Sequence, residues 1–291
     1  MPSKNHHRRS QQFSLTLGST ILLVFAALFF IFAFANSLFV NRRDRVNILL
    51  HSTDRITYYS LSTTDEVNYI IYFRPDSKIL VPGGYQRYRF GALAKLALLE
   101  KKPELLKKAY ASATSSFTDF YFHSSNPEIL YGNTIPEDIR YPSLTELFLY
   151  HSNANPLDRL YIWYRFLTAG RAHFTLISSP KIEEDFAKSY QGFFYNKSYR
   201  KERKLVQVIY TKKYRTADLV GRILEGNGIQ VVDISYDNEP HNTCLVVENT
   251  TNFSRTAKDI SNYFQCKLQK GETGTFDILF ILGDKEDYWE A

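Results

Sequence analysis

The chain has 291 residues, of which 44% are hydrophobic and 15% aromatic, so it holds ample apolar material for folded cores and is not wholly disordered. Its formal net charge of +6 favours anionic neighbours such as lipid head groups or phosphate-bearing envelope polymers, although solvated surface lysines account for it equally well. Only two cysteines are present, which excludes a multi-cysteine zinc site and a disulfide-dense scaffold.

A long uncharged stretch stands near the N-terminus. No charged side chain occurs between Arg9 and Arg42, and residues 21–35 carry no polar side chain. Because a helix needs about 20 apolar residues to cross a bilayer core, residues 15–40 are predicted to form a single transmembrane signal anchor. A short cytoplasmic tail, residues 1–14, precedes it. The expected location is therefore the cell membrane, with the bulk of the chain extracytoplasmic.

A cleaved signal peptide is the alternative for this stretch. Ala33-Phe34-Ala35 resembles a small-x-small cleavage site behind a basic leader. The hydrophobic region of a signal peptide usually has about 7 to 15 residues, and the greater length here favours an uncleaved anchor. Lysine and arginine residues flank both ends, so charge alone leaves the orientation undecided.

Residues 46–190 are predicted to form a mixed α/β region. Short apolar runs bounded by turn residues predict strands at 47–50, 56–61 and 67–73. Apolar residues at helical spacing then predict a helix over 90–100 and a second helix that begins at Pro103.

Two further helix starts carry specific N-terminal signals. Ser143 and Glu146 fit a capping box, and Asn155 before Pro156 fits an N-cap followed by proline at the first helical position. The second of these helices is expected to end at Gly170. Its predicted packing stripe consists of Leu157, Leu160, Tyr161, Tyr164 and Leu167.

Residues 191–204 are predicted to be a basic linker between two domains. The cations that make it a candidate binding segment are Lys197, Arg200, Lys201, Arg203 and Lys204. A plain exposed linker is one interpretation, and contact with an anionic glycopolymer or a membrane surface is another. Binding of nucleic acid is not expected of an exported domain.

Residues 205–289 alternate between strands and helices in a regular order. The predicted elements are strands at 206–210, 229–234, 243–247 and 277–282, with helices that begin at Thr216 and Ser254. This order, β-α-β-β-α-β, predicts two split βαβ units that form one sheet with both helices on one face. The expected fold class is therefore α/β (α+β): an N-terminal transmembrane helix, a mixed region and a C-terminal βαββαβ domain.

The two cysteines lie within this last region. In the split arrangement, the end of the second helix near Cys266 returns above the start of the third strand near Cys244. A disulfide requires an oxidising compartment and a Cα separation below about 7 Å. The sequence does not fix which face of the strand Cys244 occupies, so a disulfide and two free thiols are both open.

The segment VQVIYTKKYRTADLVGRILEGNGIQVVDI, followed by TCLVVENTTNFSRTAKDISNYF and DILFILGDKEDYWE, resembles the C-terminal domain of LytR-type cell-envelope proteins. The likeness covers about 85 residues and rests on element order and short apolar runs. The loop 210–215 lacks the Asn-Gly pattern typical of that domain. The resemblance implies an envelope protein that contacts wall or polymer components.

Upstream, NILLHSTDR, VPGGYQRYRFGALAKL and PELLKKAYASATSSFTDFYF resemble segments of the LytR-CpsA-Psr phosphotransferases. Members of that family transfer a glycopolymer from a polyprenyl pyrophosphate carrier, with arginines on the pyrophosphate and aspartates on a divalent metal such as Mg²⁺. The resemblance implies that Asp54 and Arg55 are the first Asp-Arg pair. It implies a second carboxylate at Asp65 and a cation at Arg89.

The family pattern is incomplete in this chain. Residues 79–81 run directly into Pro82 without the Pro-Arg-Asp step, and the sequence after Tyr121 does not resemble the family's later half. The seven histidines show no metal-ligand spacing, and the motifs of other catalytic classes are missing. We therefore predict a non-catalytic module that binds wall polymer or envelope proteins, without cofactor or metal. The alternative is an active, metal-dependent glycopolymer phosphotransferase using polyprenyl-pyrophosphate-linked donors.

Overall fold

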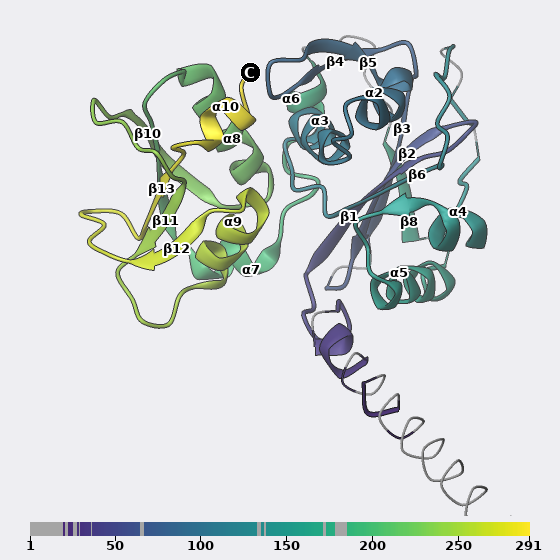
Figure 1. The fold of residues 1–291 in the computed structure, drawn as a ribbon, viewed down its shortest axis with the longest axis horizontal. Coiled ribbons are helices and arrows are strands. Elements are labelled where there is room, and N and C mark those ends of the chain that lie inside the picture. The colour runs from purple at the N-terminus through teal and green to yellow at the C-terminus, as the bar shows by residue number, and fades with distance from the viewer. Residues whose placement is uncertain are drawn as a thin grey trace, which may run out of the picture.

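The structure is a computed structural model. It describes residues 20, 23–25, 28, 30–35, 37–64, 67–132, 135–136, 138–170, 173–177 and 185–291. Two α/β domains lie side by side, each on its own sheet, and the described N-terminal helical residues leave from the base of the first domain (Figure 1). No helix within the described residues combines the length and hydrophobicity that a bilayer crossing needs. Of the predicted anchor, residues 15–40, positions 15–19, 21–22, 26–27, 29 and 36 lie outside the described part of the chain.

The first domain is built on a mixed sheet and a hairpin. Its strands are β1 (Arg45–His51), β2 (Ile56–Ser62), β3 (Asn68–Phe73), β4 (Lys78–Val81), β5 (Gln86–Arg89), β6 (Phe120–His123), β7 (His151–Ser152) and β8 (Phe174–Ile177). The sheet has the order β7-β6-β1-β2-β3-β8, and β4 and β5 form a separate hairpin. β6 is parallel to β1 and β8 is parallel to β3, whereas β1, β2 and β3 are antiparallel.

Helices cover both faces of this sheet. They are the 3₁₀ helix η1 (Phe90–Ala92), α2 (Leu93–Leu99), α3 (Glu104–Thr114), α4 (Leu144–Leu149), α5 (Pro156–Thr168) and α6 (Asp185–Tyr190). Leu49 of β1 joins a core with α2, α3 and α6, whereas Ile48 and Leu50 join a core with α4 and α5. Since alternate strand residues point to opposite faces, β1 is buried on both sides. The predicted mixed α/β region is confirmed.

The predicted caps of α4 and α5 are also confirmed. Ser143 and Glu146 form a reciprocal capping box at the start of α4. The Asn155 side chain accepts the Asp158 N–H at 2.8 Å at the start of α5.

The packing stripe predicted on α5 is wrong for three of its five residues, whereas Tyr161 of the stripe packs against the core. Leu160, Tyr164 and Leu167 face outward, with exposed fractions of 40, 53 and 63%, while Ile162 and Phe166 are buried. The error has a physical cause: α5 carries apolar residues on two faces, and the more regular of the two is not the one that meets the core.

The second domain contains β9 (Leu205–Tyr210), α8 (Tyr214–Gly226), β10 (Gln230–Tyr236), β11 (Leu245–Glu248), α9 (Arg255–Phe264), β12 (Lys267–Lys270), β13 (Ile278–Ile281) and α10 (Lys285–Tyr288). Its strand order is β10-β9-β13-β11-β12. β9 with β10 and β11 with β12 are parallel pairs, and β13 lies between them, parallel to β9 and antiparallel to β11. Residues of α8 and α9 share one core with β9, β11 and β13.

The predicted split βαββαβ arrangement is therefore wrong. Each helix connects two adjacent strands, and the last strand is inserted between the two units. The strand that the prediction missed, β12, has the sequence KLQK and lies at the sheet edge, where an apolar run is not required. Helix α8 also begins earlier than predicted, with Lys213 at the N-cap and Thr216 buried within the first turn.

Cys244 and Cys266 are joined by a disulfide, and their Cα atoms lie 4.9 Å apart. Each cysteine directly precedes one strand of the parallel pair β11 and β12. The Lys267 N–H donates to the Cys244 carbonyl at 3.1 Å. The bridge therefore fixes the point at which both strands enter the sheet.

The two domains are docked through close backbone contacts. Helix α3 packs against α8, and Gly226 of α8 lies against Ser115, which ends α3 in the left-handed conformation. The C-terminal segment also reaches the first domain, where Gly83 N–H donates to the Glu290 carbonyl at 2.8 Å. Between the domains, the predicted linker 191–204 contains α7 (Lys197–Glu202) and the buried Phe194.

A row of three histidines crosses β1, β6 and β7. His51 is in register with His123, and His123 is in register with His151. His51 is buried, and its Nε2 lies 3.4 Å from the Phe90 carbonyl oxygen. Burial lowers the pKa of His51 to about 4, and it also lowers the pKa of His123.

The buried His51 predicts that the folded protein loses stability at mildly acidic pH. A histidine in the unfolded chain has a pKa of about 6.5, so between about pH 6.5 and 4 the unfolded chain binds a proton that folded His51 does not. Stability from this residue is therefore complete above pH 6.5 and falls with pH through that window. By pH 4.5 we expect a loss of about 2.5 kcal/mol.

Urea denaturation of the full chain and of His51→Gln at pH 7.5 and 4.5 measures this effect. The variant is less stable at pH 7.5 but should lose less stability on acidification, because it lacks the titrating group. Equal losses for both proteins would contradict the assignment to His51.

Candidate functional site

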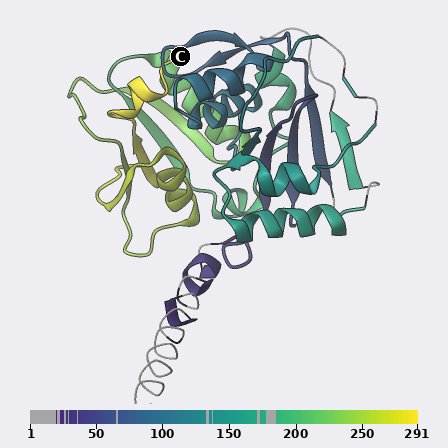
Figure 2. The same ribbon diagram turned by 45° about the vertical axis from the view of Figure 1, so that its right-hand side comes forward.

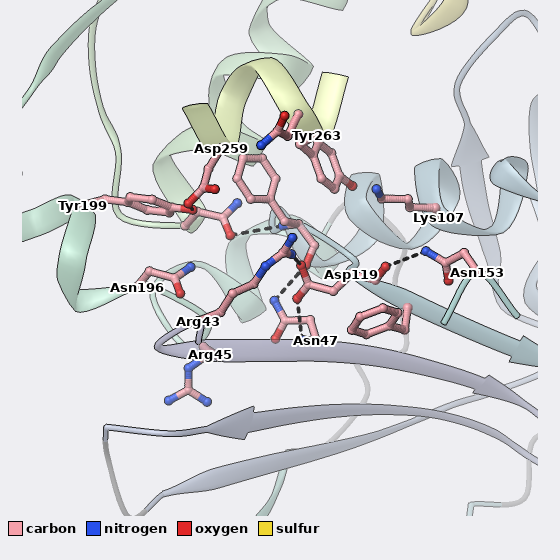
Figure 3. A pocket seen from close by; sticks show the side chains of 14 residues that line it. Arg43, Arg45, Asn47, Lys107, Asp119, Asn153, Asn196, Tyr199, Asp259 and Tyr263 are labelled. Atoms are coloured by element: carbon pink, nitrogen blue, oxygen red, sulfur yellow. Dashed lines mark hydrogen bonds and ion pairs between the residues drawn. The ribbon is translucent and has the colours of Figure 1, made fainter. Parts of the chain in front are cut away.

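A polar pocket of about 180 Å³ lies where the two domains meet (Figure 3). One wall comes from β1, α3 and the segment before β6, and the other comes from α7, α9 and the residue after α8. The pocket is lined by Arg43, Arg45, Asn47, Lys107, Phe117, Asp119, Phe120, Asn153, Asn196, Tyr199, Asn227, Asp259, Asn262 and Tyr263. These positions are far apart in the sequence, so the site exists only when both domains are folded and docked.

Arg43 and Asp119 form an ion pair at the centre of the pocket. Asp119 stands just before β6, where its carboxylate also accepts the Asn47 N–H at 2.8 Å. Burial raises the pKa of Asp119, opposed by the Arg43 guanidinium and the Asn47 amide. The same ion pair raises the pKa of Arg43. The carboxylate therefore holds Arg43 in place at the edge of β1.

Asparagine side chains form much of the pocket wall. Asn47 donates through Nδ2 to the Phe117 carbonyl at 2.8 Å and accepts the Ser60 hydroxyl at 2.6 Å. On the facing domain, Asn227 accepts the Phe117 N–H at 3.2 Å. Asn227 also donates through Nδ2 to the Ile223 carbonyl at 2.6 Å, so both amides are held by the protein itself.

Lys107 extends from α3 toward the second domain. Its amine lies 4.1 Å from the ring centroid of Tyr263 on α9, within cation–π distance. The Tyr263 ring in turn stacks on Phe117, with centroids 4.1 Å apart. Burial lowers the pKa of Lys107 to about 8, so a fraction of these amines is neutral at slightly alkaline pH. A bound anion would favour the charged form.

The opposite wall is a hydrogen-bonded seam between the domains. Tyr199 of α7 donates to the Asp259 carboxylate at 2.8 Å, and Arg255 lies 3.5 Å from the same carboxylate. Asp44, just before β1, accepts both the N–H and the hydroxyl of Ser198 at 2.6 Å. This seam holds the domain orientation on which the pocket depends.

A larger groove of about 570 Å³ continues from the pocket toward the N-terminal helix. The two hollows share Arg43, Phe120, Asp259 and Asn262. Cations outnumber carboxylates along them: Arg42, Arg43, Lys107, Arg255 and Lys258 against Asp119, Asp158 and Asp259. The Arg45 guanidinium is directed away from the cleft, to Ser60 and the Tyr69 ring. The combined cleft is thus polar, rich in amides and cationic.

The Asp-Arg pair predicted from sequence lies elsewhere, in the turn between β1 and β2. Arg55 is 3.0 Å from Asp54 and 2.9 Å from Glu146, and Asp54 is also 3.3 Å from Arg140. Glu146 belongs to the capping box of α4. The guanidinium therefore ties the turn to α4.

The other predicted site residues are not brought to that turn. Arg89 ends β5 and faces Asp76 at 3.8 Å. Asp65 lies outside the described residues. Within the described ranges, no group of three or more histidine, cysteine, aspartate or glutamate side chains is arranged to hold a metal ion.

The predicted basic cluster is distributed around α7. Lys197, Arg200 and Lys201 lie on this helix, and Arg203 and Lys204 follow it. Lys204 pairs with Glu248 at 3.4 Å and Asp277 at 3.7 Å, and Arg200 stacks over Tyr195. From the same segment, the pocket takes Asn196 and Tyr199.

Sequence reasoning missed the pocket residues because each looks ordinary in its own segment. Arg43 is one of several charges that flank the predicted anchor, and Lys107 occupies a polar position of α3. Asp119 gave the clearest signal, as a carboxylate directly before the buried strand β6. Only the docking of the second domain brings Tyr199, Asp259 and Tyr263 to them.

A scan of protein-family models finds no match to this chain. A search of curated proteins also finds no match.

Solved structures with similarity to the chain include LytR-CpsA-Psr family proteins. The crystal structure of B. subtilis TagT is 14% identical, with a TM-score of 0.25 over 28% of this chain and 33% of that one. The LytR-CPS2A-psr family protein YwtF (TagT) with bound octaprenyl pyrophosphate lipid is 12% identical, with a TM-score of 0.24 over 27% of this chain and 32% of that one. Lmo1026 from Listeria monocytogenes is 9% identical, with a TM-score of 0.33 over 48% and 83%. The chain thus spans about a third of these two TagT structures.

Proposed function

We propose that this chain is a single-pass, membrane-anchored envelope protein whose interdomain cleft binds an anionic, hydroxyl-bearing envelope polymer without catalysing its transfer. The observation that carries the proposal is the cationic, amide-lined cleft formed by the pocket and the adjoining groove. Cations attract phosphate or carboxylate groups, and the amides of Asn196 and Asn262 in the cleft walls can hydrogen-bond to hydroxyl groups. A phosphate-bearing glycopolymer presents both.

Two observations support the location. Described residues of the N-terminal stretch that are large and apolar, such as Leu23, Phe25, Phe30 and Phe32, are exposed, as a segment surrounded by lipid would be. The Cys244–Cys266 disulfide agrees with an oxidising, extracytoplasmic compartment.

The residues that the phosphotransferase alternative would use are already bound by other side chains of the protein. This supports a non-catalytic role. Arg55 is held by Glu146, which itself belongs to the capping box of α4, and Arg89 faces Asp76 on a different element. A pyrophosphate transferase needs its cations directed at one developing charge. Here they stabilise separate parts of the first domain.

Binding of the full chain in phosphatidylcholine nanodiscs to a poly(glycerol phosphate) chain tests the proposal. We expect saturable binding that weakens as salt is raised from about 50 to about 500 mM, and no binding of neutral dextran. The double variant Lys107→Gln/Lys258→Gln should weaken affinity about tenfold at low salt, which corresponds to about 1.4 kcal/mol. Octaprenyl pyrophosphate, the lipid bound in the YwtF (TagT) structure, serves as a second probe.

The matched control is Lys267→Gln/Lys270→Gln, which removes the same charge from the exposed edge strand β12. Its affinity should stay within about twofold of the native chain, a change of about 0.4 kcal/mol. Equal weakening by both double variants would indicate non-specific charge attraction and overturn the cleft as the site. So would metal-dependent turnover abolished by Arg55→Ala, which would favour the phosphotransferase.

A further inference from the structure

The exposed stripe of α5 is an apolar surface that the cleft does not use. Leu160, Tyr164 and Leu167 recur at spacings of four and three residues, so they lie on one side of the helix. All three are exposed, on a helix whose opposite side is anchored in the core by Ile162 and Phe166. A rigid helix thus presents large apolar side chains outward.

Within α5, which the structure describes throughout, no charged group interrupts this stripe, because the arginines of the helix are directed to the protein. Arg159 donates from its NH1 nitrogen to the carbonyls of Leu147 and Tyr150, each at 3.0 Å. Arg165 donates to the Ser62 carbonyl. The outward side of α5 can therefore enter an apolar medium without desolvating a cation.

The same helix is joined to the N-terminal apolar segment. The Leu38 N–H donates to Asp158 of α5 at 2.8 Å. Phe39 packs edge-on against Tyr161 with centroids 5.2 Å apart, and Phe34 stacks on Phe39 at 6.2 Å. Apolar contacts thus continue from the N-terminal helical residues to α5.

The fold places α5 at the end of the molecule that the anchor leaves. Figure 2 shows α5 lying along the base of the first domain, across the direction in which the described N-terminal residues depart. A helix in that position meets the membrane surface if the N-terminal segment crosses the bilayer.

We propose that α5 lies in the membrane–water interface, with Leu160, Tyr164 and Leu167 inserted at the boundary between head groups and acyl chains. Amphipathic helices bind there through buried apolar area, and tyrosine favours that depth. The inference rests on the membrane anchor of the proposed function. It adds a second contact, which fixes the orientation of the domains and of the cationic cleft relative to the lipid surface.

Depth-dependent quenching on the full chain tests this contact. Leu160→Cys is labelled with an environment-sensitive fluorophore, since the native cysteines are joined in a disulfide. The chain is reconstituted into phosphatidylcholine vesicles with or without nitroxide-labelled acyl chains. The matched control is Val232→Cys, a similarly exposed apolar position on β10, far from the anchor in Figure 1. We expect several-fold stronger quenching and a blue-shifted emission for the label at position 160.

Flotation of the same vesicles separates the possible failures. If the chain floats with the vesicles but both labels are quenched equally weakly, the interfacial contact is overturned and the anchor stands. If the chain does not float, the anchor is overturned and this inference with it. Crosslinked dimers through position 160 without lipid quenching would assign the stripe to a second copy of the chain and overturn the proposal.

Discussion

Gly226→Ala is expected to lower the free energy of unfolding by about 4 kcal/mol and to separate the two domains. A Cβ at this position would lie 1.7 Å from the Ser115 carbonyl oxygen and 2.8 Å from its carbonyl carbon. Ser115 is held in the left-handed conformation at the end of α3, so no side-chain rotation relieves the clash. Urea denaturation of the detergent-solubilised full chain measures the loss, and limited proteolysis within 191–204 reports separation.

Gly221→Ala in the same helix is the matched control. Its Cβ would meet Ile234 Cδ1 at 3.0 Å, the far end of a flexible side chain. Because alanine favours a helix over glycine by up to about 1 kcal/mol, this variant should stay within about 1 kcal/mol of the native chain. If Gly226→Ala resists urea and protease as well as the control does, the two domains do not dock through the contact of Gly226 with Ser115. The interdomain pocket would then be wrong as well.

Replacement of both Cys244 and Cys266 by alanine should destabilise the second domain by about 3.5 kcal/mol. The bridge closes a loop with a sequence separation of 22 residues, and the loss of this constraint increases the entropy of the unfolded chain. Thermal or urea denaturation under non-reducing conditions measures the effect.

Reduction of the native chain is the control for the cysteine prediction, since it breaks the bond while keeping both sulfur atoms in the core. Native protein with reductant should approach the stability of the double variant, and reductant should leave that variant unchanged. Two free thiols in the unreduced native protein, shown by alkylation and mass spectrometry, would refute the disulfide.

Sequence patterns predict the helices and strands correctly where interactions within one short segment determine the secondary structure. The capping box of Ser143 and Glu146, the Asn155 cap and the strand runs of β1 to β3 agree with the structure, because their signals are local. The edge strand β12 was missed because a half-exposed strand needs no apolar run. That omission also produced the wrong sheet order.

The candidate site could not be predicted for a different reason. Its centre joins Arg43 and Asp119 of one domain to Tyr199 and Asp259 of the other, and no sequence motif links these positions. The function of the exposed apolar stripe on α5 could not be predicted from the sequence either. Periodicity identifies an apolar face, but only the folded chain shows whether protein or another medium covers it.

Hydrogen exchange of the full chain in phosphatidylcholine nanodiscs, with and without poly(glycerol phosphate), tests the proposed cleft most directly. We predict slower exchange of backbone amides at 42–47, 196–203 and 255–263, which line or support the cleft, and no change at 53–55. Protection confined to 53–55 and β5, or no protection at saturating polymer, would contradict the account.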